Sequence, residues 1–158
     1  MRVRRKMEIK KTYKFMAGGH EHVVDLDAVF SPPDGVADLE YHKFLSSFYA
    51  TISDLRGLAR TEMEAAKLAT EAEFNRLYLW FTEHFEAQAK RPTREFLRAC
   101  VETQQSWIDR KQAEMQADKN YRDAISICDA LWFHSKLVMA VTAGVAETIA
   151  NEIKGGRD

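Results

Sequence analysis

Basic side chains that follow aromatic ones are the feature of this sequence with the most evident chemistry. Lys90, Arg91, Arg94 and Arg98 come directly after an aromatic-rich segment that contains Trp80. Proteins that bind single-stranded nucleic acid use cations to hold phosphates and flat rings to stack on bases. Arg94 and Arg98 are four residues apart and share a helix face, in turns where the helix dipole disfavours cations. We predict phosphate contacts from these four cations and base stacking by Trp80. The alternative places the aromatic side chains in a hydrophobic core.

The first residues of the chain carry a second group of cations. Through Lys14 there are seven basic residues and one acidic residue, a local charge of +6, whereas the remainder has 16 basic and 23 acidic residues and a charge of -7. A basic arm on an acidic body is suited to contacting a polyanion or the acidic flank of a neighbouring subunit. We predict that five of these cations also contact DNA: Arg4, Arg5, Lys6, Lys10 and Lys11. The alternative is a solvated leader without a binding role.

The motifs of the common catalytic and metal sites are missing from the sequence. His20-Glu21-His22 lies beside two glycines and could ligate a metal, but no third ligand is evident nearby, so we expect an exposed loop. There is no GxSxG, P-loop, dinucleotide fingerprint or HExxH. We therefore predict a protein that is not an enzyme and uses no metal or cofactor. Cys100 and Cys128 fall inside helical patterns, which favours buried, reduced thiols in a cytosolic protein.

Helices are expected to position these side chains. From about residue 38 to residue 154 the apolar residues step by three and four, which is the spacing of an amphipathic helix. A first long helix begins after a proline- and glycine-containing turn at 31–35, with Asp38 as its cap. Residues 76–80 could pair as a short strand, but their spacing favours continuation of this helix.

A proline separates the first helix from the next. Pro92 disfavours helix at the residue before it, and Thr93 can cap a short helix over 94–102. The longest helix then runs over about 106–154 and is ended by Gly155-Gly156.

The fold predicted from these elements is all-α. It is an elongated helical hairpin of two long helices, joined by a shorter middle helix and packed like a coiled coil. Residues 37–158 form this helical domain, and residues 1–36 form a basic arm and turn. In the arm, apolar residues alternate with charged ones up to Gly18-Gly19, which fits either a short β-strand or a flexible arm. These apolar residues are Val3, Met7, Ile9, Tyr13 and Phe15.

An apolar seam along the last helix predicts self-association. Tyr121, Cys128, Ser135, Thr142 and Ile149 are spaced seven apart, with further apolar residues between them. The stripe extends for about five heptads, which is too long to be covered by a small core alone. We predict a homo-oligomer. Its contacts are assigned to Ile125, Cys128, Trp132, Ser135, Met139, Thr142, Val145 and Ile149.

Composition favours a soluble, folded protein of one domain. Hydrophobic residues make up 46% and charged residues 30% of the 158 residues. No uncharged run approaches the roughly 18 apolar residues that a transmembrane span needs, so we expect no membrane partner. The amino terminus is charged without an apolar segment after it, so no secretory signal is expected and the predicted location is the cytoplasm.

From about residue 39 to 150 the chain resembles the UvsY-like recombination mediators of tailed phages. Three short motifs and one aromatic residue carry the resemblance, together with an Ala/Glu-rich helix before them and a long terminal helix after them. They are Leu77-Tyr78-Leu79-Trp80, Lys90-Arg91-Pro92-Thr93-Arg94-Glu95, Val101-Glu102-Thr103 and the spaced aromatic Trp107.

The resemblance implies an accessory factor of homologous recombination in the host cell cytoplasm. Such proteins bind single-stranded DNA, assemble into closed rings and help a RecA-like recombinase displace single-strand-binding protein. Residue by residue, it assigns DNA contact to Lys90, Arg91 and Arg94. The competing hypothesis is a phage structural or assembly adaptor that oligomerises through its long terminal helix. The two differ in whether single-stranded DNA is bound.

Overall fold

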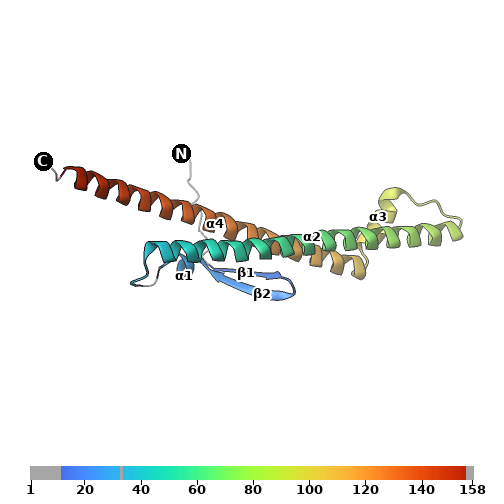
Figure 1. Cartoon of the computed structure of the whole chain (residues 1–158). Helices are drawn as coiled ribbons and strands as arrows, with labels where there is room; N and C mark the ends of the chain where they lie inside the picture. The colour runs from blue at the N-terminus through green and yellow to red at the C-terminus, as the bar shows by residue number, and fades with distance from the viewer. Residues whose placement is uncertain (1–11, 33, 156–158) are drawn as a thin grey trace, which may run out of the picture.

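The chain folds into an elongated hairpin of two antiparallel helices. The computed structural model describes residues 12–32 and 34–155. Helix α2 (Asp38–Ala87) and helix α4 (Gln105–Gly155) pack side by side, and the short helix α3 (Arg94–Glu102) connects them at one end, where it packs mainly against α2 (Figure 1). The predicted helical hairpin is confirmed. Residues 76–80 are helical, as the spacing favoured.

A small antiparallel sheet precedes the helices. Strand β1 (Thr12–Ala17) pairs with strand β2 (His20–Asp25), and a five-residue helix, α1 (Leu26–Phe30), follows. The turn between the strands is Gly18-Gly19, where both residues have positive φ, +61° and +75°. Two consecutive positive-φ residues are the signature of a tight hairpin turn. The predicted strand around Tyr13 and Phe15 is confirmed, whereas the exposed loop expected at 20–22 is wrong because these residues are in β2.

The sheet is part of the helical core. Phe15 and Ala17 of β1, Val24 of β2 and Leu26 of α1 are buried. They belong to one cluster with residues of both long helices: Tyr41, Leu45, Ile52, Ala59, Ala124, Ile127, Cys128 and Leu131. Residues 12–30 therefore belong to the same folded unit as the helices, in place of the separate arm predicted for 1–36. The rest of that segment, residues 1–11, lies outside the described residues.

The helix ends follow local rules, with one difference from expectation. Thr93 caps α3, since its hydroxyl accepts a hydrogen bond from the backbone N–H of Phe96 at 3.2 Å. Asp38 was predicted to cap α2. The capping residue is instead Ala37, without a side-chain bond, and Asp38 is the first helical residue. There its negative charge interacts favourably with the positive end of the helix dipole.

Contacts between α2 and α4 set their register and leave α4 longer at one end. Thr70 Oγ1 donates to the Arg110 carbonyl at 3.2 Å, and the Tyr41 hydroxyl lies 3.1 Å from His134 Nε2. At the start of α2, Asp38 and Thr142 line the same hollow. About 13 residues of α4 therefore continue past α2, a length of about 20 Å. Figure 1 shows this end of α4 extending away from α2.

Candidate nucleic-acid interface and assembly surface

The turn after α2 determines where the predicted DNA-contacting cations lie. Ala89 adopts the left-handed conformation, with φ of 56°. Its N–H donates to the Glu86 carbonyl at 2.9 Å, and the Lys90 N–H donates to the Phe85 carbonyl at 3.0 Å. This pair of bonds is a Schellman motif, in which glycine usually occupies the left-handed position. Because no glycine is present here, the sequence carried no signal for this tight reversal.

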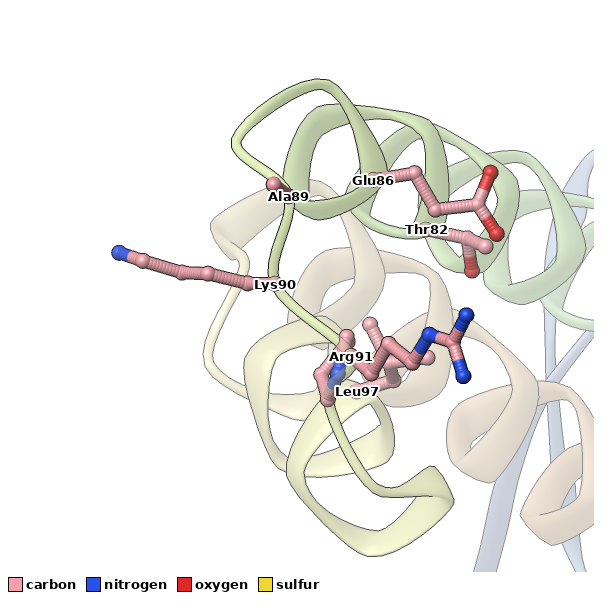
Figure 2. A pocket seen from close by; sticks show the side chains of 7 residues that line it. Thr82, Glu86, Ala89, Lys90, Arg91 and Leu97 are labelled. Carbon is pink, nitrogen blue, oxygen red and sulfur yellow. The ribbon is translucent and has the colours of Figure 1, made fainter.

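The reversal creates a cavity of about 660 Å³ between the end of α2 and the start of α3. Its lining residues are Thr82, Glu86, Ala89, Lys90, Arg91, Pro92 and Leu97. Figure 2 shows the Arg91 guanidinium on the same side as the Glu86 carboxylate and the Thr82 side chain, whereas the Lys90 side chain extends away. The structure thus brings Arg91 to a hollow that sequence reasoning did not anticipate, together with Glu86, which it missed.

The four predicted cations differ in how far neighbouring carboxylates neutralise them. Arg98 Nε lies 2.8 Å from a Glu102 carboxylate oxygen, one turn away on α3. Within residues 12–32 and 34–155, the side chains of Lys90, Arg91 and Arg94 have no carboxylate within 4.0 Å. These three cations are exposed, so an anion can approach them without displacing an existing partner. Lys90, Arg91 and Arg94 therefore form the stronger part of the predicted site.

Trp80 lies on a different face of α2 from the cavity. Its side chain is 53% exposed and stacks on His84, with ring centroids 5.2 Å apart and planes 8° apart. Residues two apart on a helix are rotated by about 200°, so Trp80 and Thr82 point in nearly opposite directions. Trp80 does not line the cavity. A base held beside Arg91 could not stack on it, although a longer strand wrapping around α2 could reach both.

Other aromatic residues near this end are partly covered without belonging to the buried core of the hairpin. Phe81 and Phe85 are half-buried, and Phe85 packs edge-on against Phe96 of α3 at 5.4 Å. Phe85 therefore helps to hold α3 against α2. The cations predicted at Arg4, Arg5, Lys6, Lys10 and Lys11 lie outside the described residues, so their assignment stays a prediction.

The predicted oligomerisation residues divide between the core of the chain and its free surface. Cys128 is 1% exposed and packs inside the hairpin, so its side chain is not open to another copy in this structure. Ile125 and Ser135 are half-buried. Trp132 and Met139 are 52% and 56% exposed, and Thr142 is also exposed. The side chains of Val145 and Ile149 lie outside the described residues.

Several apolar side chains that were not assigned to the interface extend this free surface. Phe133, Leu137 and Val141 are exposed. Between the two helices, a cavity of about 430 Å³ is lined by Leu39 and His42 of α2 and by Met139 and Ala143 of α4, among others. Leu137 and Val141 line a different cavity, together with Tyr41. On the part of α4 that α2 leaves uncovered, Trp132 and Met139 lie on one flank and Phe133, Leu137 and Val141 lie on the other. We call these five residues together the distal apolar surface. One heptad pattern serves both the intramolecular core and this surface, because α2 covers only part of the circumference of α4.

The total exposed area agrees with this incomplete coverage. The accessible surface is 12194 Å² for a chain of 18.2 kDa. A compact monomer of this mass exposes about 8,100 Å². A protein–protein interface of ordinary size covers about 800 Å² per partner. The elongated shape therefore leaves ample surface for an additional contact.

A partly buried aromatic cluster connects α1 to both long helices. The His134 ring stacks on Phe30 at 4.0 Å and its Nε2 lies 3.1 Å from the Tyr41 hydroxyl, which donates to the Val29 carbonyl at 3.0 Å. Burial lowers the pKa of His134 and raises the pKa of Tyr41, so both side chains stay neutral near pH 7. These contacts account for His134 as a structural residue.

The remaining candidates for chemistry are placed as follows. His22 is in β2, and its Nε2 lies 3.0 Å from the Ala17 carbonyl oxygen. Among the residues that the structure describes, no three His, Cys, Asp or Glu side chains gather as a metal site. Cys128 is buried, as predicted, whereas Cys100 is only half-buried. Burial raises the pKa of the Cys128 thiol.

One stretch of α4 is long and apolar enough to cross a membrane by composition alone. It lies within 105–144, has a mean hydropathy of 1.4 and is 22% buried. Core helices of other proteins meet the same criterion. Here Ile127, Cys128 and Leu131 of α4 pack in the core of the hairpin. The expectation of no membrane partner stays a prediction. Comparison of the chain with family models, with curated proteins and with solved structures found no match.

Proposed function

We propose that this protein is a non-enzymatic, single-stranded DNA-binding accessory factor of phage-type homologous recombination. It helps a RecA-like recombinase to displace single-strand-binding protein from DNA in the cytoplasm of the host cell. The observation that supports the proposal most is the end of the hairpin at α3. There Lys90, Arg91 and Arg94 are exposed and have no carboxylate within 4.0 Å in the described residues. The resemblance of residues 39–150 to UvsY-like mediators supplies the biological context.

Assembly would convert this small site into an effective one. Three phosphate contacts in one copy bind weakly, but several copies on one strand act together through a high effective concentration. The distal apolar surface is the candidate contact between copies, because Trp132 and Met139 remain exposed after the hairpin has formed. Its apolar side chains gain about 25 cal/mol for each Å² removed from water.

Anisotropy of a labelled single-stranded oligonucleotide, titrated with protein at several salt concentrations, tests DNA binding. With three phosphate contacts per copy, log affinity should fall with a slope of about -2 against log salt. Replacing Lys90, Arg91 and Arg94 together by Glu should abolish binding. A control variant reverses three other exposed cations, Lys43, Lys67 and Arg122. Because it has the same net charge, retained binding by the control shows that position matters. An equal loss of DNA affinity in both variants would show that Lys90, Arg91 and Arg94 do not form a specific binding site.

Light scattering tests the assembly with a matched pair of substitutions. Met139 and Met115 are both on α4 and are 56% and 65% exposed. Met139→Glu should lower the mass toward that of a monomer, because it places a charge in the distal apolar surface. Met115→Glu should leave the mass unchanged. A wild-type protein that is monomeric at micromolar concentration would refute the assembly.

A second candidate function is supported by the same apolar surface. In an assembly adaptor, the distal apolar surface would bind other protein subunits and the basic residues would contact acidic protein. Both functions require self-association, so the mass does not separate them. Binding of the oligonucleotide does: an oligomer with no affinity for single-stranded DNA below about 10 µM would favour the adaptor.

A further inference from the structure

The cavity at the turn after α2 contains groups that phosphate binding does not use. A site that held only phosphate would present donors and cations. Here the carboxylate of Glu86, which is a hydrogen-bond acceptor, lines the same cavity as Arg91. Thr82 also lines it, and its hydroxyl proton is already donated to the Tyr78 carbonyl at 2.8 Å. The Thr82 oxygen is therefore left as an acceptor on the side of Glu86.

The two charged side chains in the cavity leave space between them. Glu86 and Arg91 make no ion pair with each other within 4.0 Å, and neither side chain has a hydrogen bond in the part of the chain that the structure describes. Their charged groups nevertheless point to the same side (Figure 2). Pro92 and the buried Leu97 add apolar walls. The cavity thus presents a cation, an anionic acceptor and an apolar wall to one ligand, and its volume of about 660 Å³ exceeds that of a nucleotide.

We propose that this cavity binds one nucleobase of the DNA strand and prefers a base with an exocyclic amino group. Arg91 pairs with the phosphate of the bound nucleotide, the Glu86 carboxylate accepts a hydrogen bond from the amino group, and Pro92 and Leu97 contact the base. The inference rests on the proposed function, because it describes how that same site selects among single strands.

Cytosine and thymine provide the sharpest comparison. The two bases have similar size, but cytosine carries an amino donor where thymine carries a carbonyl acceptor. A carboxylate facing the thymine carbonyl would set two acceptors against each other and leave both unpaired. A carboxylate facing cytosine makes a charge-assisted hydrogen bond. Wild-type protein should bind oligo(dC) about fivefold more tightly than oligo(dT), which is the low end of base discrimination by one side chain.

The test is a titration of labelled oligo(dC) and oligo(dT) of equal length at pH 8, where cytosine is unprotonated. Glu86→Gln should bring the two affinities to within about twofold, because the amide can donate to the thymine carbonyl as well as accept from cytosine. The control is Glu83→Gln, which removes the same charge one turn earlier on α2 from a residue that does not line the cavity. It should retain the preference for cytosine.

The outcomes separate this inference from the proposed function. If wild-type protein binds both oligonucleotides with equal affinity, the inference is overturned and DNA binding stands. A preference for cytosine that persists in Glu86→Gln also overturns it. If neither oligonucleotide binds, both the inference and the proposed function fail. Both variants should stay folded, because Glu86 and Glu83 are exposed and make no side-chain hydrogen bond within the described chain. Circular dichroism of each variant checks that the helices are retained.

Discussion

Replacing Ala89 by Gly should stabilise the protein, because Ala89 occupies a backbone conformation that suits glycine. Its φ is 56°, and the left-handed conformation costs an L-residue about 1–2 kcal/mol. Glycine avoids this cost, but its greater freedom in the unfolded chain destabilises the folded state by about 0.4–1 kcal/mol and so offsets part of the gain. Ala89 is exposed, so little packing is lost with its methyl group. The free energy of unfolding should therefore increase by about 0.5–1 kcal/mol.

Urea denaturation followed by far-ultraviolet circular dichroism measures this change directly. Protein concentration must be held constant, because association would itself shift the transition. In a thermal experiment the same gain corresponds to a rise in Tm of about 1–4 °C. The slope of the unfolding free energy against urea should stay the same, because the substitution does not alter the surface exposed on unfolding.

Ala87→Gly is the matched control for Ala89→Gly. Ala87 is the last residue of α2, is exposed and has ordinary helical geometry. Glycine there should destabilise the protein by about 0.5–1 kcal/mol. The same substitution at positions two residues apart should thus change the free energy of unfolding in opposite directions. If Ala89→Gly destabilises the protein as Ala87→Gly does, the turn after α2 does not have the geometry on which the cavity depends.

Substitutions at three further positions test other local features, each by urea denaturation. Gly57→Ala should raise the free energy of unfolding by about 1 kcal/mol, because an added methyl meets no atom within 4 Å and alanine favours helix; no gain would indicate a hidden contact. Thr93→Ala should lower it by about 1 kcal/mol through loss of the α3 cap, and Thr93→Ser should restore most of that loss. Hydrogen bonds from Arg76 and then Ser106 lower the pKa of Glu73 to about 2. The stability that Glu73 provides is therefore present above its unfolded pKa of about 4.3 and is lost as the pH falls toward 2. The free energy of unfolding of Glu73→Gln should fall less steeply than that of the wild type between about pH 5 and pH 2. Parallel pH curves for the two proteins would contradict the assignment.

The helices were predictable because their signals are local. Pro92 and Thr93 mark the break and the cap before α3, and both are where they were expected. The spacing of apolar residues every three to four positions predicted α2 and α4 almost to their ends. Such signals depend on backbone sterics and on one amphipathic face, so they need no knowledge of the rest of the fold.

Features that depend on tertiary contacts were predicted less well. Gly18-Gly19 was interpreted as the end of a strand, although two glycines also suit a tight turn into a second strand. Cys128 and Trp132 share one heptad pattern, but α2 and the sheet cover the first and leave the second exposed. The cavity could not be foreseen, because Ala89 carries no signal for positive φ and the rotation of α2 relative to α3 decides which side chains line it.

The core joins the early strands to helix α4, so the strands are synthesised long before the helix that covers them. Phe15 is buried in the same cluster as Ile127 and Leu131, more than a hundred residues later. A ribosome adds about 5–20 residues per second, so the early strands wait roughly 5–20 s before α4 emerges to cover them. During that interval their apolar sides and unpaired edges are open to solvent and to other nascent chains. The strands of the sheet can therefore be fully covered only after α4 has been synthesised.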